Sequence, residues 1–142
     1  MANRDNPRRG AQFEEFTQLF FSRRRIKLER GFVVDVGVAD QKRPHKFDLG
    51  SHEPPVLVEC KRHTWTKGGN APSAKLAVWN EAMYYFATAP QHYRRILAVL
   101  RSLRGEESLA EHYIKRFEHL IPEKVEIWEI DPKAATGARV HP

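Results

Sequence analysis

Hydrophobic residues recur along the chain with two alternating periods, one helical and one of every second residue. Over residues 11–27 the apolar positions lie three and four residues apart, which predicts a helix, and Gly31 is expected to end it. Valines at every second position predict a strand over 32–38. The same reasoning predicts further strands over 45–50, 56–62, 96–100 and 125–130, and further helices over 73–89 and 109–121.

Turn and cap residues indicate how these elements connect. Residues 40–44 predict the turn of a hairpin, and Ser108 with Glu111 matches a capping box at a helix start. The apolar run at 96–100 is typical of a strand buried on both faces. The expected order is αβββαβαβ, a single α/β domain over 1–142 with a mixed central sheet flanked by helices. Residues 1–9 and 132–142 are polar or rich in small residues, and we expect both to be flexible tails.

Composition narrows the class of protein. The chain has 142 residues, of which 41% are hydrophobic and 30% charged, as in a folded globular domain. Its net charge of +6 favours a polyanionic partner, nucleic acid before an anionic membrane. One cysteine excludes an intramolecular disulfide, and no apolar run approaches the roughly 20 residues that span a bilayer. We therefore expect a cytoplasmic protein that binds nucleic acid and no membrane.

Three charged residues lie in or beside a strand that is otherwise built to be buried. Glu59 and Lys61 are two apart, so they share a face of the strand expected over 56–62. Asp48 lies on the strand before it and adds a second carboxylate. Buried charges are costly without compensation. A structural ion pair on an edge strand is one explanation, but the apolar run before Glu59 favours a central strand, where unused charges are rare.

Two neighbouring carboxylates and a lysine can serve phosphodiester hydrolysis. Carboxylates held close raise each other's pKa unless a cation lies between them. Mg²⁺ suits such a place, because it takes oxygen ligands and completes its shell with water and substrate phosphate. Such a metal polarises a phosphoryl oxygen and lowers the pKa of a water molecule. Lys61 would orient that water or stabilise the negative charge of the transition state.

This arrangement resembles the PD-(D/E)XK nuclease superfamily, in which an acidic residue and an E-x-K sequence lie on adjacent strands. Here ten residues separate Asp48 from Glu59-Cys60-Lys61, and Phe47 stands at the proline position, which varies among members. The superfamily core, αβββαβ, matches the order expected over roughly residues 10–101. The resemblance implies a restriction-endonuclease-like fold, extended here by a C-terminal helix and strand. It also implies Asp48 and Glu59 as ligands of Mg²⁺ or Mn²⁺, with Lys61 catalytic.

Two further stretches resemble particular branches of this superfamily. Residues 9–14, RGAQFE, are similar to an R-G-x-x-F-E helix start, which implies that Glu14 supports the metal or its water shell, with Glu15 as the neighbouring alternative. A solvated position near the helix N-terminus is the other interpretation of Glu14. Asn80-x-x-x-Tyr84 is similar to the Q-x-x-x-Y of RecB-like branches. Asn80 and Tyr84 are therefore candidate accessory residues, with packing as the alternative.

Basic residues near these elements are candidates for holding nucleic acid. Arg62, His63 and Lys67 follow the strand that carries Glu59, and Arg24 and Arg25 close the first helix, where they also favour the helix dipole.

Other residues with reactive or aromatic side chains fit less specific roles. Trp65 either stacks on a base or packs inward. Cys60 points to the other face of its strand and is expected to be a small core residue. The spacing of His52, Cys60 and His63 does not favour zinc, and Gly68-Gly69 lacks the lysine of a Walker loop.

The leading hypothesis is a Mg²⁺- or Mn²⁺-dependent deoxyribonuclease, most simply an endonuclease. The resemblance favours DNA, with RNA as the alternative substrate. One domain of this size has little room for a target-reading module, so the protein would cut by structure, act as a homodimer, or take its specificity from a partner protein. The second hypothesis is a nuclease fold that binds nucleic acid without cutting, and the third is an interaction domain that docks an acidic protein.

Overall fold

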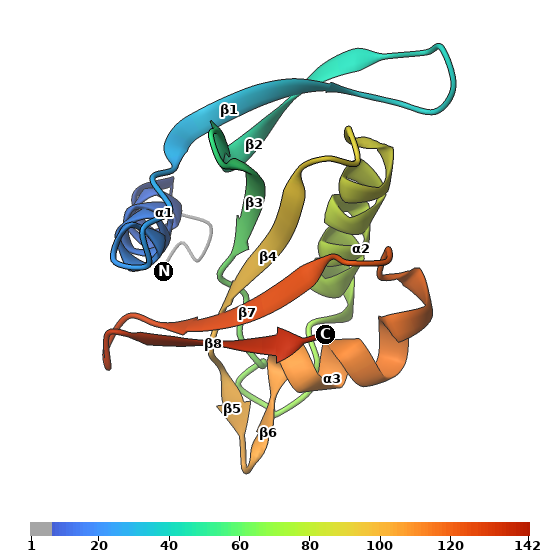
Figure 1. Cartoon of the computed structure of the whole chain (residues 1–142). Coiled ribbons are helices and arrows are strands. Elements are labelled where there is room, and N and C mark those ends of the chain that lie inside the picture. Colours follow the sequence, from blue (N-terminus) through green and yellow to red (C-terminus); the bar gives the residue numbers. More distant parts are fainter. Residues whose placement is uncertain (1–6) are drawn as a thin grey trace.

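The computed structural model describes residues 7–142, which form a six-stranded sheet with three helices packed on it (Figure 1). The sheet order is β1-β2-β3-β4-β7-β8. Its strands are β1 (Glu29–Val36), β2 (Arg43–His52), β3 (Pro55–Lys61), β4 (Arg94–Leu100), β7 (Glu126–Asp131) and β8 (Thr136–His141). Neighbours β3, β4 and β7 are parallel, and the other three pairings are antiparallel. The expected α/β class with a mixed sheet is confirmed, and most of its pairings are antiparallel.

The helices cover both faces of the sheet (Figure 1). One face packs on α1 (Pro7–Ser22), and the other on α2 (Ser73–Thr88) and α3 (Leu109–Phe117). A small hairpin of β5 (Leu103–Arg104) and β6 (Glu107–Ser108) precedes α3, and the 3₁₀ turn η1 (Glu118–Leu120) follows it. The capping box at the start of α3 is confirmed, since Ser108 and Glu111 each accept the other's backbone N–H.

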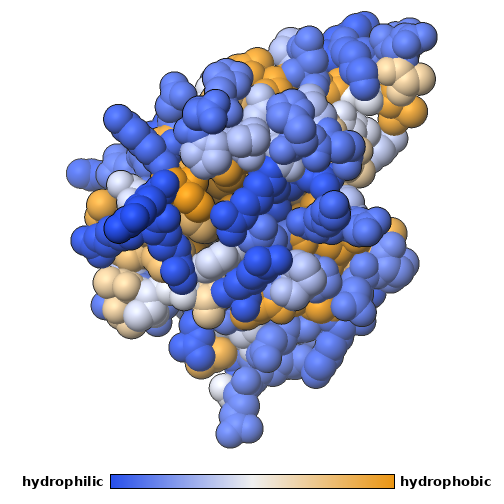
Figure 2. Space-filling model, viewed as in Figure 1, coloured by the Kyte–Doolittle hydropathy of each residue, from blue (hydrophilic) through white to orange (hydrophobic). Residues whose placement is uncertain are grey.

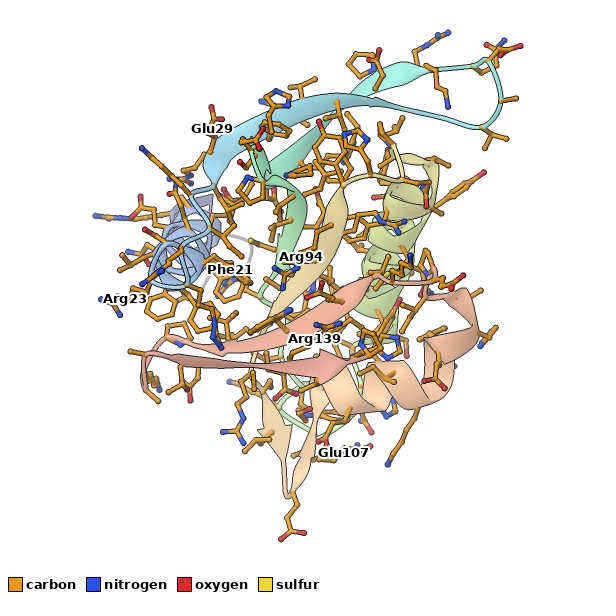
Figure 3. All side chains as sticks on the ribbon, viewed as in Figure 1. Phe21, Arg23, Glu29, Arg94, Glu107 and Arg139 are labelled. Carbon is orange, nitrogen blue, oxygen red and sulfur yellow. The ribbon has the colours of Figure 1, made fainter. Side chains whose placement is uncertain are left out.

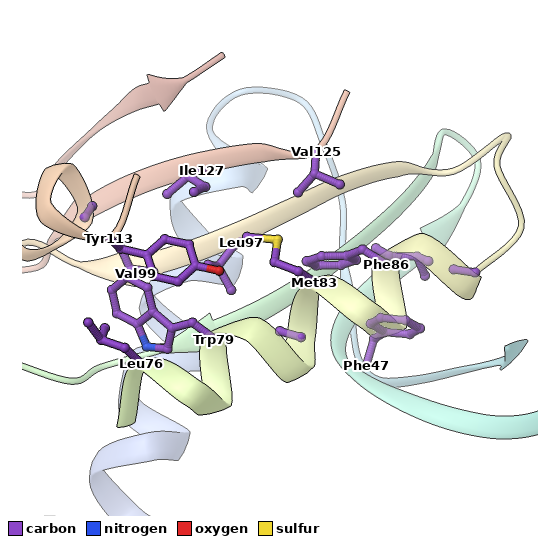
Figure 4. Packing of buried hydrophobic residues seen from close by; sticks show 14 of the residues in the cluster. Phe47, Leu76, Trp79, Met83, Phe86, Leu97, Val99, Tyr113, Val125 and Ile127 are labelled. Carbon is purple, nitrogen blue, oxygen red and sulfur yellow. The ribbon is translucent and has the colours of Figure 1, made fainter. Parts of the chain in front are cut away.

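Two hydrophobic clusters hold these layers together. Figure 4 shows the larger cluster, in which Trp79 of α2 packs on Tyr113 of α3, and the Phe47 ring of β2 stacks on Phe86 at 5.8 Å between centroids. Phe21 of α1 belongs to the smaller cluster and lies between its helix and the sheet in Figure 3. Alternate residues of β4 enter opposite clusters. The apolar run at 96–100 is therefore a strand buried on both faces, as expected.

The first helix differs from its expected bounds at both ends. Pro7, Arg8 and Arg9 belong to α1, so the expected tail over 1–9 is wrong for these three residues; positions 1–6 lie outside the described residues. Proline suits the first turn of a helix because it lacks an N–H that would be unpaired there. The helix ends at Ser22, and Arg25 turns the chain with a φ of 66°. Gly31, expected to end the helix, instead lies within β1 with a φ of 63°.

The second expected tail is also wrong over most of its length. Thr136–His141 form β8, which pairs with β7 at one edge of the sheet. Gly137 allows this, because a Cβ there would lie 2.6 Å from the Phe20 ring of α1. Strand β8 lacks a hydrophobic alternation, and its backbone hydrogen bonds to β7 hold it in place instead.

Hydrophilic residues cover much of the face seen in Figure 2, and hydrophobic residues show between them over the middle of the molecule and on the underside of the projecting β1–β2 hairpin. Within residues 7–142, none of the helices combines the length and the apolar character needed to span a bilayer.

Candidate active site

The expected site lies where β2 and β3 part. Their pairing runs from His52–Pro55 to Leu49–Val58, and the next opposed residues are Asp48 and Glu59. Here side chains take over the backbone hydrogen bonds. The N–H of Cys60 donates to Asp48 Oδ2 at 2.8 Å, and the N–H of Asp48 donates to Glu59 Oε1 at 3.3 Å. Each carboxylate is thereby held by the backbone of the other's strand.

Strand β2 changes direction at this point. Phe47 packs into the cluster beneath α2, whereas Leu49 packs into the cluster beneath α1. In a regular strand these two residues would share a face. Asp48 lies between them and reaches Glu14 on α1 as well as Glu59 on β3. Cys60 joins the α1 side beside Thr17, and burial raises the pKa of its thiol, in keeping with a core residue.

Glu59 is the most buried carboxylate of the site, with 8% of its surface exposed. Burial, followed by the negative charge of Asp48, raises its pKa to about 8. Lys61 acts in the opposite direction, as expected of a cation near this carboxylate. The side chains around Glu59 therefore do not supply enough positive charge to offset the charge of its ionised carboxylate.

Glu14 brings a third carboxylate to the same place. Burial raises its pKa, followed by the charge of Asp48, and the two side chains lie within hydrogen-bonding reach of each other. Arg30 of β1 partly offsets this by donating to Glu14 Oε1 at 3.1 Å. Its other terminal nitrogen donates to Glu15 at 3.3 Å, but Glu15 is far more exposed. Glu14 rather than Glu15 is the first-helix glutamate that meets Asp48.

His45 was not predicted from the sequence. Its ring stacks on Tyr85 of α2 at 3.7 Å and meets Phe47 edge-on at 4.6 Å. Its Nε2 lies 3.6 Å from Glu59 Oε1 and is buried without a hydrogen-bond partner. Burial lowers the pKa of His45, which favours the neutral ring. The only sequence signal is its position on β2, three residues before Asp48.

The donor atoms suit a hard divalent cation. Within residues 7–142 no three His, Cys, Asp or Glu side chains form a group that could hold a metal ion as they stand. Yet Mg²⁺ needs only one or two protein carboxylates, because it retains waters and takes substrate phosphate. Glu14 and Asp48 approach each other closely, which two ionised carboxylates do only with a proton or cation between them. The residues present therefore fit Mg²⁺ or Mn²⁺.

The accessory candidates on α2 have other neighbours. The hydroxyl of Tyr113 donates to Asn80 Oδ1 at 2.7 Å, which places Asn80 in the packing of α3 against α2. Tyr84 is exposed and lines a hollow beneath the β1–β2 hairpin together with Val38 and Gln41.

The basic candidates divide into two places. Arg62, His63 and Lys67 line one hollow beyond the end of β3. His63 Nδ1 there accepts the indole N–H of the core residue Trp79 at 2.9 Å. Arg24 and Arg25 follow α1 at the opposite end from Glu14, about 15 Å away along a helix of this length. The guanidinium of Arg24 covers the rings of Phe20 and Trp128.

Trp65 packs inward. Its indole N–H donates to the carbonyl of Ser102 at 3.1 Å, and the guanidinium of Arg104 lies 3.9 Å from its ring centre. Only 8% of its surface is exposed, so it offers no face for a base.

Comparison of the chain with protein-family models, with curated proteins and with solved structures finds no match.

Proposed function

We propose that this protein is a divalent-metal-dependent nuclease that hydrolyses phosphodiester bonds of DNA, most simply as an endonuclease. A restriction-endonuclease-like arrangement of the αβββαβ part is included in the proposal. The observation that carries it is the meeting of Asp48 and Glu59 where β2 and β3 part, with the pKa of Glu59 raised to about 8 and Lys61 on the same strand.

Each side chain has a role that its surroundings support. Asp48 and Glu59 are oriented by backbone N–H groups, so each needs little rearrangement to present an oxygen to a cation. Glu14 would hold a water of that cation, because it reaches the site through Asp48. The cation, Mg²⁺ or Mn²⁺, would supply charge neutralisation at the phosphate and acidify a bound water.

Lys61 supplies the remaining positive charge. Its ammonium group would donate a hydrogen bond to the attacking water or to a phosphoryl oxygen as negative charge builds there. The water oxygen forms a bond to phosphorus, the bond from phosphorus to the leaving sugar oxygen breaks, and the proton lost by the water passes to solvent or to the leaving oxygen.

A binding module without catalysis is the second candidate. One observation favours it: the described part of the chain contains no group of three metal-ligating side chains already arranged around a common point. The presence of Asp48, Glu59 and Lys61 together favours the enzyme, since loss of one of them would be the simplest mark of a module that no longer cuts.

The test is cleavage of plasmid and single-stranded DNA with Mg²⁺ or Mn²⁺, comparing the wild-type protein with Lys61→Ala and Asp48→Ala. The proposal expects divalent-dependent cutting that both substitutions abolish. Absence of cutting by the wild-type protein in every combination, with DNA binding retained, would support the binding module instead.

A further inference from the structure

Two hollows flank the C-terminal end of β3, just beyond Lys61. Arg9 and Arg62 line both of them. The first, of about 700 Å³, extends from α1 to the β7–β8 turn and includes Arg101 and Lys133. The second, of about 350 Å³, extends over the loop after β3 to the start of α2 and includes Lys67. Because the shared residues belong to both linings, the two hollows form one continuous surface.

This surface is strongly basic. Its cationic residues are Arg9, Arg62, Lys67, Lys75, Arg101 and Lys133, whereas Asp131 is its one acidic residue within the described chain. Asp131 Oδ1 already accepts the backbone N–H groups of Lys133 and Ala134. Arg101 lies 3.6 Å from Glu129, which neutralises part of its charge. The surface therefore has an excess of positive charge beside a site that holds three carboxylates.

Among the residues that the structure describes, the same surface offers no exposed Phe, Tyr or Trp ring on which unstacked bases could lie. Its Phe and Trp lining residues, Phe13 and Trp65, are 6% and 8% exposed, and Arg104 covers the Trp65 ring. The imidazole of His63 is only partly exposed, and its Nδ1 accepts the indole N–H of Trp79. Of all the Phe, Tyr and Trp residues among residues 8–142, Tyr84 is the one that is exposed. It lies beneath the β1–β2 hairpin, outside both hollows. Proteins that grip single strands combine a basic groove with exposed aromatic faces. Here the basic groove occurs alone.

We propose that the two hollows together bind the phosphate backbone of duplex DNA, and that they lead it past the end of β3 without unstacking its bases. This inference rests on the proposed function for the position of the scissile phosphate. It adds the substrate class, a base-paired duplex, and the residues that contact its backbone on either side of Lys61.

The experiment measures binding by fluorescence anisotropy, with a 30-base-pair duplex and each of its separated strands, in EDTA so that no cleavage occurs. Salt is titrated from low to high concentration. The test variant carries Lys67→Gln and Lys133→Gln together, one exposed residue from each hollow. The control variant carries Lys115→Gln and Arg116→Gln together, which are exposed on α3 outside both hollows. Both pairs remove two positive charges from exposed side chains, and an RNA duplex of the same sequence is measured alongside.

The expected result is tighter binding of the DNA duplex than of either single strand or the RNA duplex. The first pair should lower the slope of log affinity against log salt by about 1.8, which at 0.1 M salt is a loss of roughly 60-fold, while the α3 pair changes binding little. Tighter single-strand or RNA binding, equal effects of both pairs, or no binding would each overturn the inference. If the protein cuts DNA but its binding does not depend on Lys67 and Lys133, this inference fails and the proposed function stands. If the duplex binds as expected but is not cut with Mg²⁺, only the proposed function fails.

Discussion

Asp48 and Glu59 are joined through each other's strands: the N–H of Asp48 donates to Glu59 Oε1 at 3.3 Å, and the N–H that follows Glu59 in the chain donates to Asp48 Oδ2 at 2.8 Å. The backbone pairing of the two strands ends at Leu49 and Val58, and these side-chain bonds replace it one residue further along. Backbone N–H groups therefore orient the two strand carboxylates, and the cost is a pair of like charges in a largely buried place.

Replacement of Glu59 by glutamine should alter how stability depends on pH. The pKa of Glu59 is about 8 in the metal-free folded protein and near its ordinary value of 4.5 when unfolded. The folded protein thus keeps a proton that the unfolded chain releases, so the free energy of unfolding falls as pH rises from about 4.5 to about 8. Glu59→Gln removes this loss, so above pH 8 its free energy of unfolding should exceed that of the wild-type protein by on the order of 5 kcal/mol, since each pKa unit corresponds to about 1.4 kcal/mol.

The measurement is urea unfolding in EDTA at pH 5 and pH 8.5 for both proteins. The two should have similar stability at the lower pH and separate at the higher one. If the wild-type protein instead gains stability relative to Glu59→Gln as the pH rises, other groups in the folded protein must stabilise the ionised carboxylate of Glu59.

Magnesium should reverse this loss of stability. A cation that binds the folded protein at ten times its dissociation constant adds about 1.4 kcal/mol to the free energy of unfolding. We expect Mg²⁺ to raise the Tm of the wild-type protein by a few degrees at pH 8.5, and less at pH 6.5, where protons compete for Glu59. Asp48→Asn keeps an acceptor for the N–H of Cys60 and should lose the response. An equal rise in Asp48→Asn would place the cation elsewhere.

His45 should act as a positioning residue for Glu59. Its ring is held by Tyr85 and Phe47, and its buried Nε2 faces Glu59 Oε1 at 3.6 Å. Groups that orient metal ligands typically contribute 10- to 100-fold to activity or metal affinity. His45→Ala should lower kcat by about tenfold, and His45→Gln, which retains an N–H donor, should recover part of it. Equal rates for both variants and the wild type would contradict this role.

Gly50 should be necessary for the packing of β1 against β2. A Cβ at this position would lie 2.4 Å from the Phe32 ring and 2.7 Å from Phe32 Cβ, and Phe32 is itself buried. Gly50→Ala should destabilise the protein by about 1–3 kcal/mol. Gly10 of α1 has nothing within 4 Å of such a Cβ, so Gly10→Ala is the matched control and should stabilise the helix by about 0.5–1 kcal/mol. Chemical unfolding compares the two, and a neutral Gly50→Ala would mean that Phe32 can move aside.

The sequence predicted those parts of the fold that depend on apolar periodicity. The continuous apolar run at 96–100 was predicted to be a strand buried on both faces, and in the structure Leu97 and Val99 enter one core while Ile96 and Ala98 enter the other. Strand β8 carries no such pattern, because backbone pairing with β7 and the close approach of Phe20 to Gly137 hold it in place. Gly31 has the positive φ of a helix end, yet it lies inside a strand.

The site residues also fall into those that the sequence predicted and those that it did not. Spacing within one strand predicted that Glu59 and Lys61 share a face, and the adjacent strand brought Asp48 to them. His45 and Arg30 were missed, because their relation to the carboxylates depends on how β2 bends and on how α1 lies against β1. Neither relation has a period that can be read along the chain.

We propose that Asp48, Glu59 and Lys61 together cut DNA with a divalent cation. The most direct measurement follows supercoiled plasmid after EDTA treatment and stepwise return of Mg²⁺, with wild type and Lys61→Gln side by side. We expect nicked or linear product that appears only with Mg²⁺ and only in the wild-type protein, while both proteins show the same Mg²⁺-induced rise in Tm. Cutting by Lys61→Gln at the wild-type rate, or cutting that persists in EDTA, would contradict it.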